Sequence, residues 1–168
     1  AGADRCEDFI IRDHAAGDIE TEDCSVLLDI IAQNFQQENL SFYLGTGYRH
    51  CMIINRKHPN GHTDYKCVPP HDILDRKIGE YLPKGPGADF LIDMMKKSYE
   101  LLKNHPINKA REAKGLNPAN FIWIWGQGTR PCLPDFNEKF GVNGTVISAV
   151  DLIKGIGTFA GLHVPYVE

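Results

Sequence analysis

Residues 121–131, written FIWIWGQGTRP, place a continuous apolar run directly before two glycines, an arginine and a proline. An apolar run of this length predicts a strand buried on both faces, as in the middle of a covered sheet. Glycines after such a strand allow backbone N–H groups to approach a ligand, and ligand sites of α/β sheets lie at the carboxyl ends of strands. Arg130 would then offer a planar fork of donors to a phosphate or carboxylate. The alternative is an ordinary tight turn with a solvated arginine.

The rest of the chain alternates strand and helix patterns, which predicts an α/β fold with a mixed sheet and flanking helices. The Asn-Gly pair in His58–His62 predicts a hairpin that returns Tyr65–Val68 as an antiparallel strand. The first helix is expected to bury Val26, Leu27, Ile30 and Ile31. Further strands are expected at Phe9–Arg12, Leu40–Leu44, Tyr48–Ile54 and Thr145–Ser148. Helices are expected from about residue 20 to Asn34, at Ala88–Asn104, from Pro106 to near Gly115, at Pro134–Phe140 and from Asp151 toward Gly161.

Composition excludes several classes of partner. With 22 acidic and 18 basic residues the 168-residue chain has a formal net charge of -4, so it has no basic footprint for nucleic acid or an anionic membrane surface. No apolar run approaches the roughly 20 residues that span a bilayer. The five cysteines are scattered and never form a CxxC pair, which favours reduced thiols and a cytoplasmic location.

Two further segments combine a strand end with groups that bind anions. In FYLGTGYRHC (Phe42–Cys51) a Gly-x-Gly turn is followed by Tyr48, Arg49 and His50. Neighbouring residues of a strand point to opposite faces, so if Arg49 faces a site His50 need not, and a hydrogen-bonded structural role is open for His50. The segment Asp13–Asp18 precedes a helix N-terminus, which is a favourable location for an anion.

Three other patterns are weaker. In PPHD (residues 69–72) the alternative role of Asp72 is to cap a short helix, and Arg111 follows a helix start where a solvated face is the alternative. The glycines of GIGTFAG (residues 155–161) resemble a dinucleotide motif but fall late in a helix instead of opening one after a strand. The histidines show no HxH or HExxH spacing, so no metal site can be argued from these residues.

Taken together and in order, DHAAGDI, GTGYRH, PPHDI, EYLPKG, NHPINKAR, NPANFIWIWGQGTRP and ISAVDLIKGIGTFAGL resemble the archaeal-type cofactor-independent phosphoglycerate mutases. That family belongs to the alkaline phosphatase superfamily, and the resemblance covers essentially the whole chain. A bacterial branch of the family has been labelled a proposed homoserine kinase. The sequence departs from the family at Asp18, where the family pattern has a histidine.

The resemblance implies an enzyme that interconverts 3-phosphoglycerate and 2-phosphoglycerate through a phosphoserine intermediate, without 2,3-bisphosphoglycerate. It implies two divalent metals, Mn or Mg, whose ligands lie outside this chain, as does the serine. Residues 1–125 would be an inserted substrate-binding domain of an alkaline-phosphatase-like enzyme, and residues 126–168 a return segment toward its phosphatase-like core. This fragment alone would be inactive.

The resemblance also implies roles for individual residues. Lys154 matches a lysine near the phosphoryl group, and His14 or His50 is the candidate acid/base that exchanges protons with the hydroxyl groups. The ligand is a small anionic phosphorylated substrate, for which converging arginines suit phosphate and carboxylate. Two alternatives stay open, a homoserine kinase-type phosphotransferase of the same family and a non-catalytic anion-binding module. The candidate substrate-binding residues are Asp13, Arg49, His50, Arg111 and Arg130.

Overall fold

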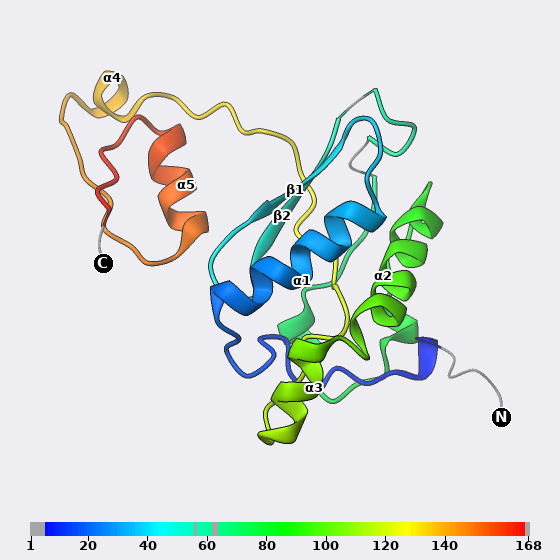
Figure 1. Cartoon of the computed structure of the whole chain (residues 1–168). Coiled ribbons are helices and arrows are strands. Elements are labelled where there is room, and N and C mark those ends of the chain that lie inside the picture. The colour runs from blue at the N-terminus through cyan, green and yellow to red at the C-terminus, as the bar shows by residue number, and fades with distance from the viewer. Residues whose placement is uncertain (1–5, 56, 62–63, 167–168) are drawn as a thin grey trace, which may run out of the picture. The chain divides into compact units, whose positions relative to one another are not determined.

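The computed structural model of the protein describes residues 6–55, 57–61 and 64–166 (Figure 1). The chain forms two compact units, Ala1–Gly128 and Thr129–Glu168. The expected α/β class is confirmed, since helices accompany a sheet, but the sheet of the described residues has only two strands. The first unit contains α1 (Thr21–Asn34), β1 (Leu40–Leu44), β2 (His50–Ile54), α2 (Ala88–Leu102) and α3 (Pro106–Ala113). The second unit contains α4 (Phe136–Phe140) and α5 (Asp151–Phe159).

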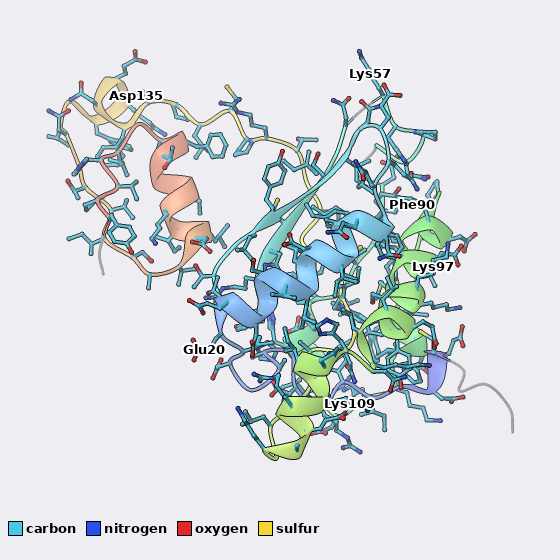
Figure 2. All side chains as sticks on the ribbon, in the orientation of Figure 1. Glu20, Lys57, Phe90, Lys97, Lys109 and Asp135 are labelled. Carbon is cyan, nitrogen blue, oxygen red and sulfur yellow. The ribbon has the colours of Figure 1, made fainter. Side chains whose placement is uncertain are left out.

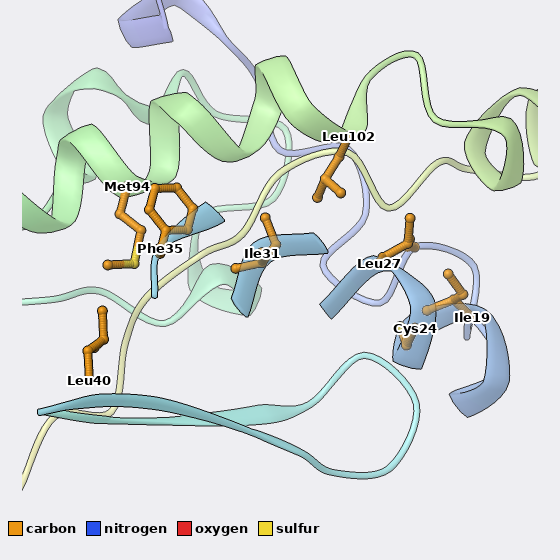
Figure 3. Packing of buried hydrophobic residues seen from close by; sticks show 9 residues of the cluster. Ile19, Cys24, Leu27, Ile31, Phe35, Leu40, Met94 and Leu102 are labelled. Atoms are coloured by element: carbon orange, nitrogen blue, oxygen red, sulfur yellow. The ribbon is translucent and has the colours of Figure 1, made fainter. Parts of the chain in front are cut away.

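Helix α1 packs against both β1 and α2, so the main core of the first unit lies around it. Figure 3 shows side chains from α1, α2 and the start of β1 meeting in this interior. The buried residues of α1 are Cys24, Leu27 and Ile31, which recur at helical spacing. The expectation that Val26 is buried is wrong: its side chain is 47% exposed. The buried stripe runs through Cys24 instead, on the face that meets the sheet and α2.

The strands β1 and β2 form an antiparallel hairpin in which Leu40 pairs with Ile54 and Leu44 pairs with His50. Its turn is anchored to the start of α1, because the backbone N–H of Gly47 donates to Thr21 Oγ1 at 3.0 Å. Gly47 has a positive φ of 58°, and a Cβ there would lie 3.4 Å from the carbonyl oxygen of Ile19. Glycine is therefore favoured at this turn by its backbone geometry, while a Cβ would make an ordinary contact.

Three of the expected strands reduce to single bridges. Ile10 bridges Lys77, and Thr145 bridges His163. Lys66 pairs with Lys84 through reciprocal N–H to carbonyl bonds of 2.8 and 3.0 Å. The predicted return of Tyr65–Val68 alongside β2 is wrong, because the loop that follows brings Lys84 to the place expected for β2. His62 of the Asn-Gly segment lies outside the described residues.

The apolar run 121–125 is extended but forms no strand in the described structure, and Trp125 is 47% exposed. Helix side chains bond the backbone at Ile122 within the run and at Ala119 just before it. The buried Asn108 donates through Nδ2 to the carbonyls of Leu102 and Ala119 at 2.9 and 3.0 Å, and its Oδ1 accepts from Ala119 N–H at 2.9 Å. The Ser98 hydroxyl accepts from Ile122 N–H at 3.0 Å. The prediction of a buried strand was therefore wrong, although its side chains still pack on the core.

In the second unit, neighbouring segments pack closely against a glycine of α5. Gly157, buried within α5, lies so close to Val146 and Val164 that a Cβ would come within 2.9 Å of the former. Both Gly155 and Gly157 are inside α5 rather than before it, so these glycines do not open a helix as those of a dinucleotide motif would. Asp135 caps α4 by accepting from Glu138 N–H at 3.0 Å.

All five cysteines are free thiols in the structure, two buried in the first unit and two exposed. Burial raises the pKa of the Cys6, Cys24 and Cys67 thiols. Across the part of the chain that is described, no helix combines the length and the apolar character needed to cross a bilayer.

Replacing Asn108 by alanine should lower the free energy of unfolding by about 2–4 kcal/mol, because it removes the side-chain partner of the half-buried N–H and carbonyl of Ala119 and one of the two bonds to the Leu102 carbonyl. Urea titration measures this change. Lys109→Ala on the same helix is the matched control, since Lys109 is exposed and its side chain pairs with the neighbouring Glu112, and it should change stability little. Equal effects of the two substitutions would contradict the proposed role of Asn108.

Candidate anion-binding site

Four of the sequence motifs meet in the first unit through a row of aromatic rings. The His14 ring lies edge-on to Tyr48, with centroids 5.6 Å apart, and to His71 at 6.0 Å. His71 in turn lies edge-on to Trp125 at 5.4 Å. We call Tyr48, His14, His71 and Trp125 the ring cluster. It joins the DHAAGD, GYRH and PPHD segments to the end of FIWIW, although these segments are far apart in sequence.

His14 belongs to a loop, residues 13–18, that leads into α1 at Glu20, which Figure 2 labels. The loop carries positive φ angles at Ala16, Gly17 and Asp18, which is uncommon for residues other than glycine. The Asp13 carboxylate holds this shape by accepting N–H bonds from Ala15 at 2.8 Å and Gly17 at 2.6 Å. The loop is thus folded around Asp13.

Burial tends to raise the pKa of Asp13, but bonds from Asn117, Ala15 and Gly17 outweigh it and hold the pKa below its usual value. The Asn117 bond is a 2.7 Å contact from its Nδ2. The ionised Asp13 carboxylate therefore stabilises the fold above the ordinary carboxyl pKa of about 4. This stabilisation is lost as the pH falls through the lowered pKa of Asp13.

Arg111, reaching from α3, completes the support of this loop. Its Nη2 donates to the carbonyl of Ala16, and its Nε donates to the carbonyl of Asn117 at 3.0 Å. Its Nη1 lies 3.8 Å from an Asp23 carboxylate oxygen of α1. Only 7% of Arg111 is exposed, so the solvated helix face considered from sequence is wrong. Its donors are directed at the protein's own loop and helix, which makes it a support for the site.

Arg49 lies beside the ring cluster. Its guanidinium is 4.9 Å from the centroid of the Tyr48 ring, and Nη1 donates to the Tyr48 hydroxyl at 3.2 Å. His50 makes a different contact, in which Nδ1 accepts from Gly45 N–H at 3.4 Å across the hairpin turn. Partial burial of its imidazole lowers the pKa of His50. The geometry favours the structural alternative for His50, while the Arg49 side chain is exposed beside Tyr48.

Arg130 and Lys154 belong to the second unit. The Arg130 guanidinium lies 5.2 Å from the centroid of the Phe159 ring of α5, and Lys154 is on the same helix. Among the described residues neither side chain forms an ion pair. Arg130 is exposed and Lys154 is half-buried.

The site of the first unit is rich in donors. Arg49 and the two imidazoles can present N–H groups, while the Asp13 carboxylate is already committed to the loop. Within residues 6–55, 57–61 and 64–166 no group of three His, Cys, Asp or Glu side chains could hold a metal ion. The arrangement suits an anion rather than a cation.

Sequence reasoning left four contributors without a role: Tyr48, His71, Asn117 and Trp125. In PPHD the alternative considered from sequence was that Asp72 caps a helix that follows; in the structure Asp72 is the last residue of the short helix Pro70–Asp72. The signal that could have found His71 was the same motif, with a histidine placed directly after two prolines.

Comparison with known proteins agrees with this architecture. A profile of the 2,3-bisphosphoglycerate-independent phosphoglycerate mutase family matches residues 3–108. The chain belongs to this family. A family mutase from Methanosarcina barkeri is 46% identical over 158 residues, which are 94% of this chain but 39% of that mutase. A probable mutase of the same description from Geobacter sulfurreducens is 45% identical over 160 residues, with 95% and 39% covered.

This chain thus spans about 39% of the length of these mutases. A solved cofactor-independent phosphoglycerate mutase from Thermoplasma acidophilum shares the fold with a TM-score of 0.58 at 20% identity, over 93% of this chain and 43% of that one. A Pyrococcus horikoshii protein gives the same TM-score at 26% identity, over 94% of this chain and 36% of that one. The family description names independence from 2,3-bisphosphoglycerate, in agreement with the expectation that this compound is not used.

Arg111→Lys should lower the free energy of unfolding by about 2–4 kcal/mol, because lysine keeps the charge but cannot supply the fork that bonds two carbonyls. The matched control is Arg12→Lys, which alters an exposed pair with Asp75 and should have little effect. Thermal and urea unfolding measure both. A change for Arg111→Lys no larger than that for Arg12→Lys would show that the guanidinium does not hold the loop.

Proposed function

We propose that this chain supplies the substrate-binding part of an enzyme that interconverts 3-phosphoglycerate and 2-phosphoglycerate. Membership of the mutase family supports the reaction class. The observation that carries the proposal is the convergence of the DHAAGD, GYRH and PPHD segments on one donor-rich cluster. A phosphorylated hydroxy acid has phosphate and carboxylate groups, and such anions need several converging donors. Glycolysis in the cytoplasm is the process that we propose for the whole enzyme.

In this proposal Arg49 binds an anionic group of the substrate. It projects beside Tyr48, which restricts its movement by a ring contact and a hydrogen bond. Preorganisation of this kind reduces the entropy lost when a ligand is bound. Arg130 and Lys154 are assigned to the same substrate on the resemblance, Arg130 as a fork donor and Lys154 as a point charge near the phosphoryl group.

His14 is proposed as the acid/base. Its imidazole is half-buried between Tyr48 and His71, and it forms no hydrogen bond with another side chain or backbone group of the described chain. A ring held in place with free nitrogens can accept a proton from a substrate hydroxyl and return one to the other. The supports from Asp13 and Arg111 keep this loop in a single conformation.

We propose that the phosphorylated serine and the two divalent ions, Mn or Mg, belong to parts of the enzyme outside this chain. The described residues do not fit a metal pair, so no step is assigned to metals here. These residues contribute binding, orientation and proton transfer.

Residues 1–125 are proposed as an inserted domain and residues 126–168 as a segment that returns to a phosphatase-like core. This proposal is supported by α5, which exposes large apolar side chains of the kind that usually mark a contact surface. Leu152 is 70% exposed and Ile156 is 49% exposed. We propose that this face of α5 packs against the part of the mutase that lies outside this chain.

The test is to measure the conversion of 3-phosphoglycerate by the whole enzyme, first unmodified and then as the Arg130→Lys variant. Loss of one charge-assisted fork should cost about 2–4 kcal/mol of transition-state stabilisation, which is roughly 30- to 1,000-fold in kcat/KM. Lys139→Arg is the control, since Lys139 is also a cation placed over a ring, that of Phe140, and it should leave kcat/KM unchanged.

Two outcomes would count against the proposal. An enzyme that does not interconvert the two phosphoglycerates would overturn the function. A kcat/KM within threefold of the unmodified enzyme for Arg130→Lys would keep the function but remove Arg130 from the site.

A further inference from the structure

His71 is a ring-cluster residue with no role in the proposed function so far. It lies between His14 and Trp125, edge-on to both, with interplanar angles of 63° and 79°. Its side chain is 48% exposed, so the ring reaches solvent while two of its neighbours hold it.

The backbone around His71 is anchored on both sides. Pro70 is buried before it, and Ile73, only 2% exposed, is buried after it. Backbone N–H groups of Asp72 and Ile73 close the turn onto the carbonyls of Pro69 and Pro70. Because Pro70 and Ile73 are buried on either side of it, the backbone is held while the His71 ring is directed away from the core, where it can meet a ligand.

Within the described residues the nitrogens of His71 form no hydrogen bond to the protein. An Asp72 carboxylate oxygen lies 3.7 Å from Nε2, within ion-pair range but beyond hydrogen-bonding distance. Over the described residues, neither the His71 ring nor the His14 ring hydrogen-bonds to the protein. A ring needed only for packing would not require nitrogens, and phenylalanine would serve that purpose without polar atoms.

We infer that His71 is a further substrate-contacting residue, which donates an imidazole N–H to an anionic oxygen of the phosphoglycerate beside His14. The inference rests on the proposed function. The ring contacts fix where the imidazole lies, and Arg49 lies on the other side of the cluster, next to Tyr48. The substrate would therefore meet Arg49 on one side of His14, the proposed acid/base, and His71 on the other.

Two substitutions separate packing from donation. His71→Phe keeps an aromatic ring against His14 and Trp125 but removes both nitrogens, whereas His71→Gln removes the ring and keeps a donor. Steady-state kinetics of the whole enzyme should show His71→Phe with KM raised about 10- to 100-fold and kcat within about threefold, as expected when a binding contact is lost. His71→Gln should recover most of the KM.

The matched control is His58→Phe. His58 also has a ring contact, 5.2 Å to Phe90, but lies outside the ring cluster, and its substitution should leave KM and kcat unchanged. Circular dichroism should show every variant folded.

The outcomes are distinct. A His71→Phe enzyme with the KM of the unmodified enzyme means that the ring only packs, and the inference is wrong. A His71→Gln enzyme as impaired as His71→Phe also contradicts a donor role. If the unmodified enzyme does not turn over phosphoglycerate, the proposed function fails and this inference fails with it.

Discussion

The buried guanidinium of Arg111 is the interaction on which the rest of the site depends. It connects α3 to the carbonyl oxygens of Ala16 and Asn117 and lies against Asp23 of α1. Left without a partner, the buried carbonyl of Ala16 would be costly. A loop with three successive left-handed residues is strained on its own, so it persists because Arg111 and Asp13 hold it from two sides. The bonds from Arg111 and Asp13 therefore also fix the position of His14, which belongs to this loop.

A second constraint replaces a sheet. The extended run 121–125 has no neighbouring strand in the described structure, yet its backbone must still be satisfied. Ser98 of α2 accepts from the Ile122 N–H within the run, Asn108 of α3 bonds Ala119 just before it, and the Trp123 indole N–H donates to the Val68 carbonyl at 2.7 Å. Trp125, the last residue of this run, thereby lies edge-on to His71. Polar side chains in the helix core thus place an aromatic side chain in the site.

Local sequence was sufficient for elements set by local physics. Helices α1, α2 and α3 and the hairpin of β1 and β2 follow from apolar spacing, a proline at the start of α3 and the Gly-x-Gly turn. The expected strands failed where pairing depended on distant partners, as at Lys66 and Lys84. An apolar run does not by itself indicate whether its backbone will bond to a neighbouring strand or to side chains of a helix. That is why residues 121–125 were predicted as a strand.

The site could be predicted in part for the same reason. Arg49 and His14 stood out because their motifs place donors after glycines or before a helix. The role of Arg111 could not be read from sequence, because an arginine on a short helix is usually solvated and only tertiary packing shows that it is buried. His71 was quoted in its motif, but its ring contacts required the fold. Whether Arg130 and Lys154 act on the same ligand stays a prediction.

The central claim is that the ring cluster exists as one assembled surface. The most direct measurement is a nuclear Overhauser spectrum of the aromatic protons of the 168-residue chain, with His14 and His71 assigned by comparison with their glutamine variants. The account predicts cross-peaks between His14 and Tyr48, between His14 and His71, and between His71 and Trp125, since these rings lie edge-on to one another. A folded chain that shows none of these cross-peaks would contradict it.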